Sequence, residues 1–159
     1  MLNLFLTRVD NRLVHGQVLE GWVPRLGVRT IYVADEALYE DDFNRTILEA
    51  MGQGVIKIIV ITPANLAKTI TSEAAGKFAV LFRDIKSVVE AFQAGFALRE
   101  LNLGNIHPKP GATRLTDSVY VDANDIAGLR LLLANGVRIE ARALPTEPGV
   151  EVTGGLLEG

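Results

Sequence analysis

The 159-residue sequence contains no cysteine and only two histidines, which excludes several kinds of site. Without cysteine there is no disulfide, no thiol nucleophile and no thiolate ligand for a metal. The histidines and carboxylates show no compact spacing such as H-E-x-x-H, so we predict no metal site. No G-x-x-x-x-G-K-[ST] motif occurs, which argues against a nucleotide-hydrolysing P-loop. We therefore expect the chain to work without a bound metal or an organic cofactor.

The chain also lacks an excess of basic residues and a long apolar run. Its net charge of −3 and pI near 5.4 argue against binding nucleic acid through bulk charge. The N-terminus does not resemble a signal peptide, and no apolar run approaches the about 20 residues that span a bilayer. A composition of 48% hydrophobic and 22% charged residues is typical of a globular protein. We expect a cytoplasmic protein that associates with the membrane through a partner.

Strand and helix patterns alternate along the chain. β-branched and aromatic runs predict buried strands, and apolar residues at helical spacing predict the helices between them. The predicted strands are 2–9, 30–34, 55–61, 77–82, 98–103, 118–121 and 137–144. The predicted helices are 15–26, 41–51, 62–71, 85–94 and 122–134. The pattern implies one α/β domain over residues 1–145, with an open, mostly parallel twisted sheet and helices on both faces.

Three segments of this pattern carry more specific expectations. In the predicted helix 41–51, Phe43, Ile47, Leu48 and Met51 fall on one face. Residues 104–117 contain Gly, Pro, Asn and His without a period, which is typical of a functional or disordered loop. Residues 146–159 are rich in glycine, and we predict a loose C-terminal tail there.

A polar turn separates the first predicted strand from the first predicted helix and contains Arg8, Asp10, Arg12 and His15. In an open parallel sheet, sites form at this carboxyl edge, and the start of a helix favours an anion. The two arginines can pair with phosphate oxygens, and Asp10 can fix the tautomer of the imidazole. A neutral imidazole is the nucleophile that phosphoryl acceptance requires. Two interpretations stay open: a phosphohistidine, or a histidine that caps a helix beside surface ion pairs.

A longer motif surrounds this turn. The sequence from Arg8 to Val23 contains R-x-D-x-R-x-x-H-G-Q-V followed by G-W-V. It resembles the active-loop signature of the EIIB components of mannose/sorbose-family phosphoenolpyruvate-dependent sugar phosphotransferase systems, and the order of elements agrees over nearly the whole chain. The resemblance implies that His15 receives a phosphoryl group on Nδ1 from an EIIA histidine and passes it to a sugar imported through EIIC and EIID membrane subunits. It assigns Arg8, Asp10 and Arg12 to the same catalytic set.

A second group of candidates could bind phosphate or line a pocket: Gly16, Asp35, Arg83 and His107. Gly16 allows a bulky donor to approach the backbone closely. Asp35 and Arg83 follow predicted strands at the carboxyl edge. Asp35 could border the active loop or form a metal or general-base pair with Glu36, and a solvated strand end is the alternative. For Arg83 the alternative to a phosphate contact is a surface ion pair. His107 ends a segment that corresponds to a glycine-rich part of the family near the active loop, where Asn105 stands in place of a second glycine. An exposed loop histidine is the alternative for His107.

The sequence also leaves a second function open, a regulatory module of the same fold that senses phosphorylation state and docks to a protein. The complete charge pattern around His15 favours the carrier, because a module that only docks does not need it. A nucleotide-binding domain ranks last because no glycine fingerprint occurs. A homodimer is compatible with the sequence, and the sugar cannot be chosen from it.

Overall fold

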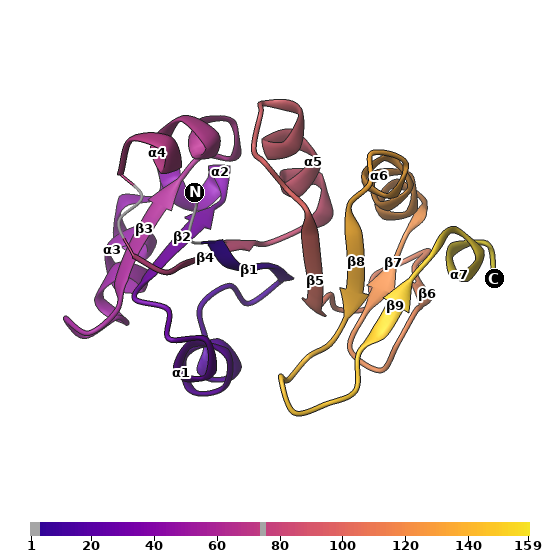
Figure 1. Ribbon diagram of the computed structural model, residues 1–159, viewed down its shortest axis with the longest axis horizontal. Coiled ribbons are helices and arrows are strands. Elements are labelled where there is room, and N and C mark those ends of the chain that lie inside the picture. The colour runs from indigo at the N-terminus through magenta and orange to yellow at the C-terminus, as the bar shows by residue number, and fades with distance from the viewer. Residues whose placement is uncertain (1–3, 74–75) are drawn as a thin grey trace.

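The computed structural model describes residues 4–73 and 76–159, in which strands and helices alternate as predicted (Figure 1). The strands are β1 (Leu4–Asp10), β2 (Thr30–Ala34), β3 (Lys57–Ile61), β4 (Phe78–Phe82), β5 (Glu100–Asn105), β6 (Thr113–Arg114), β7 (Tyr120–Val121), β8 (Arg138–Ala141) and β9 (Val150–Val152). The helices are η1 (Gln17–Trp22), α1 (Val23–Leu26), α2 (Glu36–Glu40), α3 (Asp42–Ala50), η2 (Pro63–Asn65), α4 (Leu66–Glu73), α5 (Ile85–Gln93), α6 (Ala123–Ala134) and α7 (Gly154–Glu158). The predicted start of the first strand, at residue 2, lies outside the described residues.

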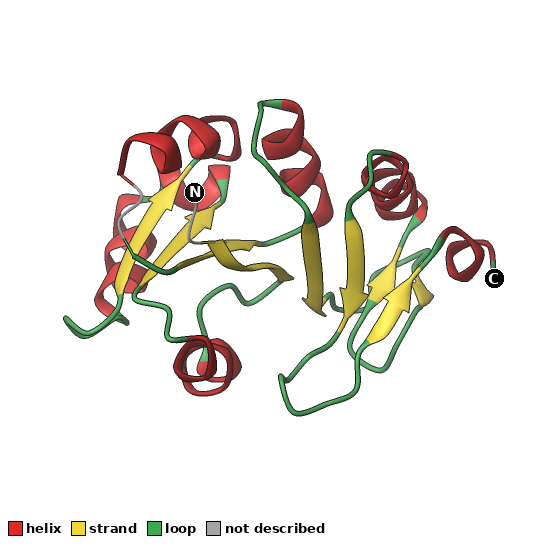
Figure 2. Cartoon of the chain, in the orientation of Figure 1, coloured by secondary structure: helices red, strands yellow, loops and turns green. Residues whose placement is uncertain are grey.

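A seven-stranded sheet forms the centre of the molecule (Figure 2). Its strand order is β3-β2-β4-β1-β5-β8-β9, which the labels of Figure 1 let the reader follow. Its strands are parallel from β3 to β8, and β9 pairs antiparallel with β8. This arrangement confirms the predicted α/β class with an open, mostly parallel sheet. It also places the end of β1, and the polar turn that follows, between the ends of β4 and β5.

Helices cover both faces of the sheet, and each face has its own core. Side chains of α4, α5, α6 and α7 belong to one buried cluster, whereas those of η1, α1 and α2 belong to the other. In Figure 1, α4, α5 and α6 lie above the sheet and α1 lies below it. The helix that follows β1 lies on one face of the sheet, and the helix that follows β4 lies on the other. The connections therefore diverge at the carboxyl edge between these two neighbouring strands. Open sheets bind ligands at such a point.

The prediction of a loose tail at residues 146–159 is wrong for most of that segment. Val150–Val152 forms β9 on the edge of the sheet, and Gly154–Glu158 forms α7, which Thr153 caps through Leu156 N. Val152 and Leu157 are buried in the larger core. The glycines led to the prediction of an irregular segment, but Val152 and Leu157 anchor it to the larger core. β9 also pairs with β8 and so covers the edge that β8 would otherwise expose.

Two further segments differ from their predictions. The loop at 104–117 is partly ordered, because Gly104 and Asn105 belong to β5 and Thr113–Arg114 pairs with Tyr120–Val121. In α3 the apolar residues do not share a buried face. Leu48 packs against the core, whereas Phe43 and Ile47 are 74% and 50% exposed.

Candidate functional site

The turn after β1 has an unusual backbone. The Leu13 amide donates to the Asp10 carbonyl at 2.9 Å, and Leu13 has a φ of +56° although its side chain is buried. A bulky residue rarely adopts this left-handed conformation, and such residues are concentrated at functional sites. The helix that follows begins as a π-helix over Gln17–Trp22, which is itself rare and common at functional sites. Both backbone features mark the turn after β1 as a candidate site.

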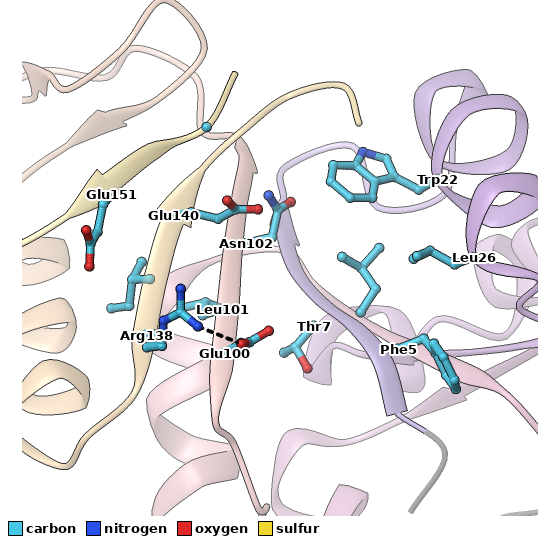
Figure 3. Close-up of a pocket in the computed structure, with 13 residues that line it drawn as sticks. Phe5, Thr7, Trp22, Leu26, Glu100, Leu101, Asn102, Arg138, Glu140 and Glu151 are labelled. Atoms are coloured by element: carbon cyan, nitrogen blue, oxygen red, sulfur yellow. Dashed lines mark hydrogen bonds and ion pairs between the residues drawn. The ribbon is translucent and has the colours of Figure 1, made fainter. Parts of the chain in front are cut away.

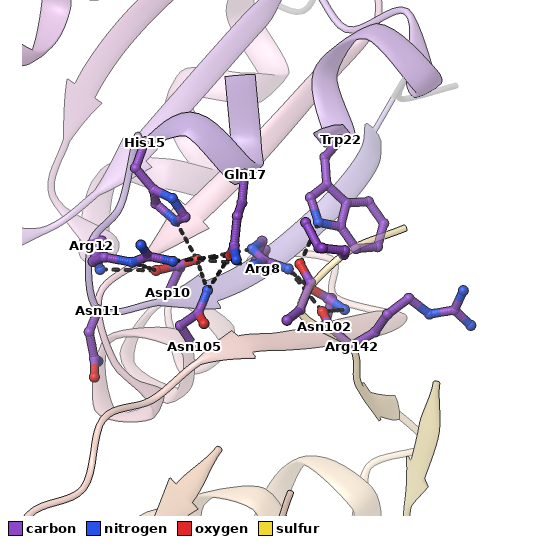
Figure 4. A network of polar contacts seen from close by, with 12 residues as sticks. Arg8, Asp10, Asn11, Arg12, His15, Gln17, Trp22, Asn102, Asn105 and Arg142 are labelled. Atoms are coloured by element: carbon purple, nitrogen blue, oxygen red, sulfur yellow. Dashed lines mark hydrogen bonds and ion pairs between the residues drawn. The ribbon is translucent and has the colours of Figure 1, made fainter. Parts of the chain in front are cut away.

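Asp10 holds the imidazole of His15. Nε2 of His15 lies 2.7 Å from Oδ2 of Asp10, and the histidine side chain is 14% exposed (Figure 4). A carboxylate can only accept, so the hydrogen lies on Nε2, and in a neutral ring Nδ1 then carries the lone pair. Oδ1 of Asp10 accepts from the Arg12 amide at 3.0 Å. The contact predicted between Asp10 and the ring is therefore present and selects the tautomer.

Arg8 lies on the inner side of Asp10 and is fully buried. Nη2 and Nε donate to Oδ2 of Asp10 at 3.0 and 3.3 Å, and Nη1 donates to Asn102 Oδ1 at 2.6 Å and to the Arg142 carbonyl at 3.0 Å. All its nitrogens are engaged and none faces solvent. The predicted pairing of Arg8 with phosphate oxygens is not met in this arrangement. Arg8 instead fixes the position of Asp10.

Two further residues make room for Arg8 and hold it. The guanidinium carbon lies 5.4 Å from the centre of the Trp22 ring, in a cation–π arrangement. The Trp22 indole donates to the Ala143 carbonyl at 3.0 Å. Below the guanidinium lies Gly104, where an added Cβ would stand 2.0 Å from Cζ of Arg8. A side chain at residue 104 is thus incompatible with the position of Arg8.

The surroundings of Asp10 keep it ionised. Burial raises the pKa of Asp10. This effect is smaller than the opposing one of its neighbours, so the pKa stays below its usual value. The neighbours act through hydrogen bonds from Asn105, His15 and the Arg12 amide, and through the charge of Arg8. Burial also lowers the pKa of Arg8, against the opposing effect of Asp10. Asp10 is therefore a fixed anion beside the histidine, although it is shielded from solvent.

A second set of hydrogen bonds closes the outer side of the site. Nδ2 of Asn105 donates to Oδ2 of Asp10 and to Oε1 of Gln17, both at 2.8 Å. The same oxygen of Gln17 accepts from Nη2 of Arg12 at 3.0 Å. Arg12 Nε lies 3.9 Å from Asp10 Oδ1, and the Arg12 side chain is 45% exposed. Arg12 is thus the exposed cation of the turn, close to His15 but free to turn toward an incoming anion.

The second group of predicted residues lies along the same edge but forms separate contacts. Arg83 binds Asp35 with two hydrogen bonds of 3.2 Å, and Asp35 also caps α2 through Leu38 N at 3.0 Å. Arg83 thus forms an ion pair, the alternative that we gave for it, whereas Asp35 is buried and not at a solvated strand end. His107 is exposed, and its amide donates to Asn11 Oδ1 at 2.6 Å. Among residues 4–73 and 76–159, no side-chain hydrogen bond or ion pair joins these three residues to His15.

Gly16 starts the helix in an ordinary helical conformation. A Cβ at this position would meet only Glu20 Oε2, at 3.9 Å. The space in front of it is open, as a close approach by a donor requires. Its role in that approach stays a prediction.

Sequence reasoning missed Asn102, Gln17 and the contacts of Asn105. Gln17 lies inside the motif, two residues after His15, and its position was a usable signal. Asn102 and Asn105 come from β5, and their part in the site depends on the pairing of Arg8 with Asn102 in the sheet register. That pairing has no signal in the local sequence.

A cavity of about 330 Å³ lies beside the inner side of this network, between η1–α1 and the face of β5 and β8, and Trp22 and Asn102 line it (Figure 3). Its polar lining includes Glu100, Arg138, Glu140 and Glu151. Glu140 and Glu151 stand directly opposite each other on paired strands, an arrangement that is unfavourable for like charges. His15 does not line this cavity. The histidine lies instead at the open edge of the sheet.

The described residues contain neither a metal-binding cluster nor a membrane-spanning helix. Residues 4–73 and 76–159 contain no group of three or more His, Cys, Asp or Glu side chains placed to hold a metal. In the same ranges, no helix has the length and apolarity needed to cross a membrane.

Comparison with known proteins identifies the class. The crystal structure of the N-acetylgalactosamine-specific IIB component 1 from Escherichia coli matches with a TM-score of 0.89 and 28% identity, covering 95% of this chain and 100% of that one. The IIBSor domain of the sorbose permease from Klebsiella pneumoniae matches with a TM-score of 0.85 and 26% identity, covering 94% and 93%. The fold and the edge site thus place the chain among the IIB components of sugar phosphotransferase systems.

The sequence comparisons name the family. Residues 4–156 match the model of the "PTS system sorbose subfamily IIB component". The sorbose-specific EIIB component of Lacticaseibacillus casei is 32% identical over 149 residues, which cover 92% of this chain and 91% of that protein. This chain belongs to the sorbose subfamily of IIB components, as the motif around His15 predicts. The components of this family are phosphotransferases.

Proposed function

We propose that His15 is the phosphoryl carrier of this IIB component. It accepts a phosphoryl group from a histidine of an EIIA protein and donates it to a sugar that enters through EIIC and EIID membrane subunits. The observation that carries the proposal is the 2.7 Å contact between Nε2 of His15 and the buried carboxylate of Asp10. That contact occupies one ring nitrogen and leaves Nδ1 as the nucleophile, which agrees with the family expectation of Nδ1 phosphorylation.

The surrounding residues support this assignment by charge and by access. The start of the helix after Gly16 favours an anion beside His15. The exposed guanidinium of Arg12 is positioned to neutralise phosphoryl oxygens during transfer. When Nδ1 bonds to phosphorus, the ring gains positive charge while Nε2 keeps its hydrogen. The ionised Asp10 stabilises that charged ring through the existing hydrogen bond.

The relatives support the proposed partners. The mannose-specific EIIAB component of Escherichia coli is 26% identical over 149 residues, which cover 92% of this chain and 46% of that longer protein. Its name joins an EIIA part to an EIIB part in one chain. We propose that this chain receives its phosphoryl group from an EIIA partner of the same kind.

The experiment is a phosphoryl-transfer assay with a built-in control. The purified protein is mixed with phosphoenolpyruvate, the two general carrier proteins and an EIIA component, and acid-labile, base-stable phosphate is measured. Because the chain has two histidines, His15→Ala is compared with His107→Ala. We expect label in the wild type and in His107→Ala and none in His15→Ala. ³¹P NMR then distinguishes Nδ1 from Nε2 phosphohistidine.

Two results would contradict the proposal. Label that persists in His15→Ala rules out the assigned residue. A wild type that takes up label but never passes it to a sugar, in membranes that contain the transporter subunits, favours the regulatory module instead.

A further inference from the structure

The outward side of α3 carries apolar residues that the fold leaves uncovered. Phe43 is 74% exposed and Ile47 is 50% exposed, and Ala50 is also exposed. They stand at positions i, i+4 and i+7, so they form one continuous ridge along the helix. Leu48 faces the core on the inner side. We call Phe43, Ile47 and Ala50 the α3 ridge.

The ridge has one acidic flank and one neutral flank. Asp42 and Glu49 each precede a ridge residue by one position, so they lie along one side of it, and both are exposed. Asn44 and Met51 follow ridge residues by one position and line the other side. The ridge is thus a line of apolar side chains with carboxylates along one edge.

The wider segment is acidic as well. Residues 36–57 contain five carboxylates and two cations, a net charge of −3 that equals the net charge of the whole chain. The carboxylates are Glu36, Glu40, Asp41, Asp42 and Glu49, and the cations are Arg45 and Lys57. Arg45 is bound to Asp42 and stacks on the ring of Tyr39. The negative charge of this surface therefore favours binding partners that carry positive charge.

Three occupants are conceivable, and charge separates them. A second copy would pair ridge to ridge with antiparallel helices, which brings Asp42 of one copy to Glu49 of the other and places like charges together. An anionic lipid surface is repelled by the same carboxylates. An apolar protein segment flanked by Lys or Arg is complementary to both the ridge and its acidic edge. Loops on the cytoplasmic side of membrane proteins carry an excess of these residues.

We propose that the α3 ridge docks an apolar segment flanked by Lys or Arg on the cytoplasmic side of the membrane subunits that receive the phosphoryl group. This inference rests on the proposed function, because that function requires a membrane partner. The ridge lies on α3, which packs on α2 and on the edge strand β3. β2 and β4 separate β3 from β1. Docking here leaves the turn at His15 free to meet EIIA and the sugar.

The test uses the full chain with inside-out membrane vesicles from cells that express the EIIC and EIID subunits of the same system. Co-sedimentation gives the half-saturating protein concentration. We expect Phe43→Ser/Ile47→Ser to raise this concentration at least tenfold, and Asp42→Lys/Glu49→Lys to raise it and to abolish its dependence on salt. Val150→Ser is the matched control, because Val150 is apolar and 42% exposed at the far edge of the sheet. It should bind like the wild type.

Each other result overturns the proposal. Equal sedimentation of wild type and Phe43→Ser/Ile47→Ser excludes the ridge, and equal binding to vesicles without the subunits indicates a lipid surface. A wild-type dimer in analytical ultracentrifugation that the ridge variant loses indicates a second copy. Labelling by EIIA in solution separates the two proposals. A protein that takes up label but does not sediment refutes the docking site, whereas one that sediments without taking up label refutes the carrier function.

Discussion

The two arginines of the site, Arg8 on β1 and Arg12 in the turn that follows, lie four residues apart and have opposite structural roles. Arg8 is fully buried, and its nitrogens are bound to Asp10, Asn102 and a backbone carbonyl. Arg12 is 45% exposed, and its side chain is held by one hydrogen bond to Gln17 and a long contact with Asp10. Asp10 lies between them, so its carboxylate joins a rigid inner half of the site to an adaptable outer half.

This difference shows how the site divides stability from chemistry. The inner half holds a buried charge in place, so loss of its interactions lowers mainly the stability of the folded state. The outer half meets the incoming phosphoryl group, so its interactions form most strongly during transfer. The comparison predicts that inner variants lose stability, whereas outer variants lose rate.

Arg8→Met should have the largest effect, because it removes a buried cation and leaves the Asp10 carboxylate without its fully buried ion partner. We expect unfolding free energy to fall by about 3–5 kcal/mol, measured by urea denaturation. Arg138→Met is the control, since Arg138 pairs with Glu100 while 78% exposed. It should cost about 0–1 kcal/mol. If Arg8→Met lowered the unfolding free energy as little as Arg138→Met does, the distinction between the inner and outer halves of the site would be wrong.

Gly104→Ala should rank next, because the new Cβ stands 2.0 Å from Cζ of Arg8. Moving a buried guanidinium out of its contacts costs about 1–3 kcal/mol by analogy with overpacked cores. Thermal and urea unfolding would measure the loss. Gly154→Ala is the control, because nothing lies within 4 Å of that position. Unchanged stability in Gly104→Ala would mean that Arg8 can shift freely.

Asn105→Ala removes the amide that joins Asp10 to Gln17, and we expect a loss of about 1.5 kcal/mol at neutral pH. The pKa of Asp10 should rise toward its usual value, because a hydrogen bond to the charged form is lost. A carboxyl whose pKa is lower in the folded state stabilises the fold fully above its unfolded pKa of about 3.9 and loses that contribution as pH falls through the folded value. The stability difference between wild type and variant should therefore shrink below about pH 3.9. Unfolding curves between neutral and acid pH measure it, and a constant difference contradicts the account.

Arg12→Ala should change stability least, by about 0.5 kcal/mol or less, because the side chain is largely solvated. Phosphoryl transfer from EIIA should nevertheless slow by about tenfold or more, since the group that neutralises the moving phosphoryl is gone. Stopped-flow or quenched transfer measures the rate, and Arg12→Lys should recover part of it. Equal rates in Arg12→Ala and wild type would remove the role assigned to Arg12.

The sequence predicted the residues close to His15 in the chain well and the residues that β5 contributes poorly. Asp10, Arg12 and His15 lie within six consecutive residues of one strand–turn–helix unit, so local pattern was enough to place them together. Asn102 and Asn105 are 94 and 95 residues away from their partners Arg8 and Asp10. Their contribution depends on β1 lying beside β5 in one register, which local periodicity does not specify.

The fold shows the same limit. The alternation of strands and helices followed from apolar spacing, and the sheet class followed from that alternation. The attachment of the C-terminal segment depended on two side chains, Val152 and Leu157, that bury themselves in a core made elsewhere. Phe43 and Ile47 were predicted on one apolar helix face with Leu48, but they are exposed. An amphipathic pattern predicts that a helix has an apolar face, but it does not predict what covers that face.

The stacking of Trp22 on Arg8 gives the protein an optical property. Trp22 is the only tryptophan in the chain, and its ring lies 5.4 Å from the Arg8 guanidinium, which in turn binds the carboxylate that holds His15. A charge added to the imidazole thus acts on an indole through two intervening side chains. The fluorescence of the unlabelled protein should report the state of the histidine, so that each transfer step can be followed in real time without a dye.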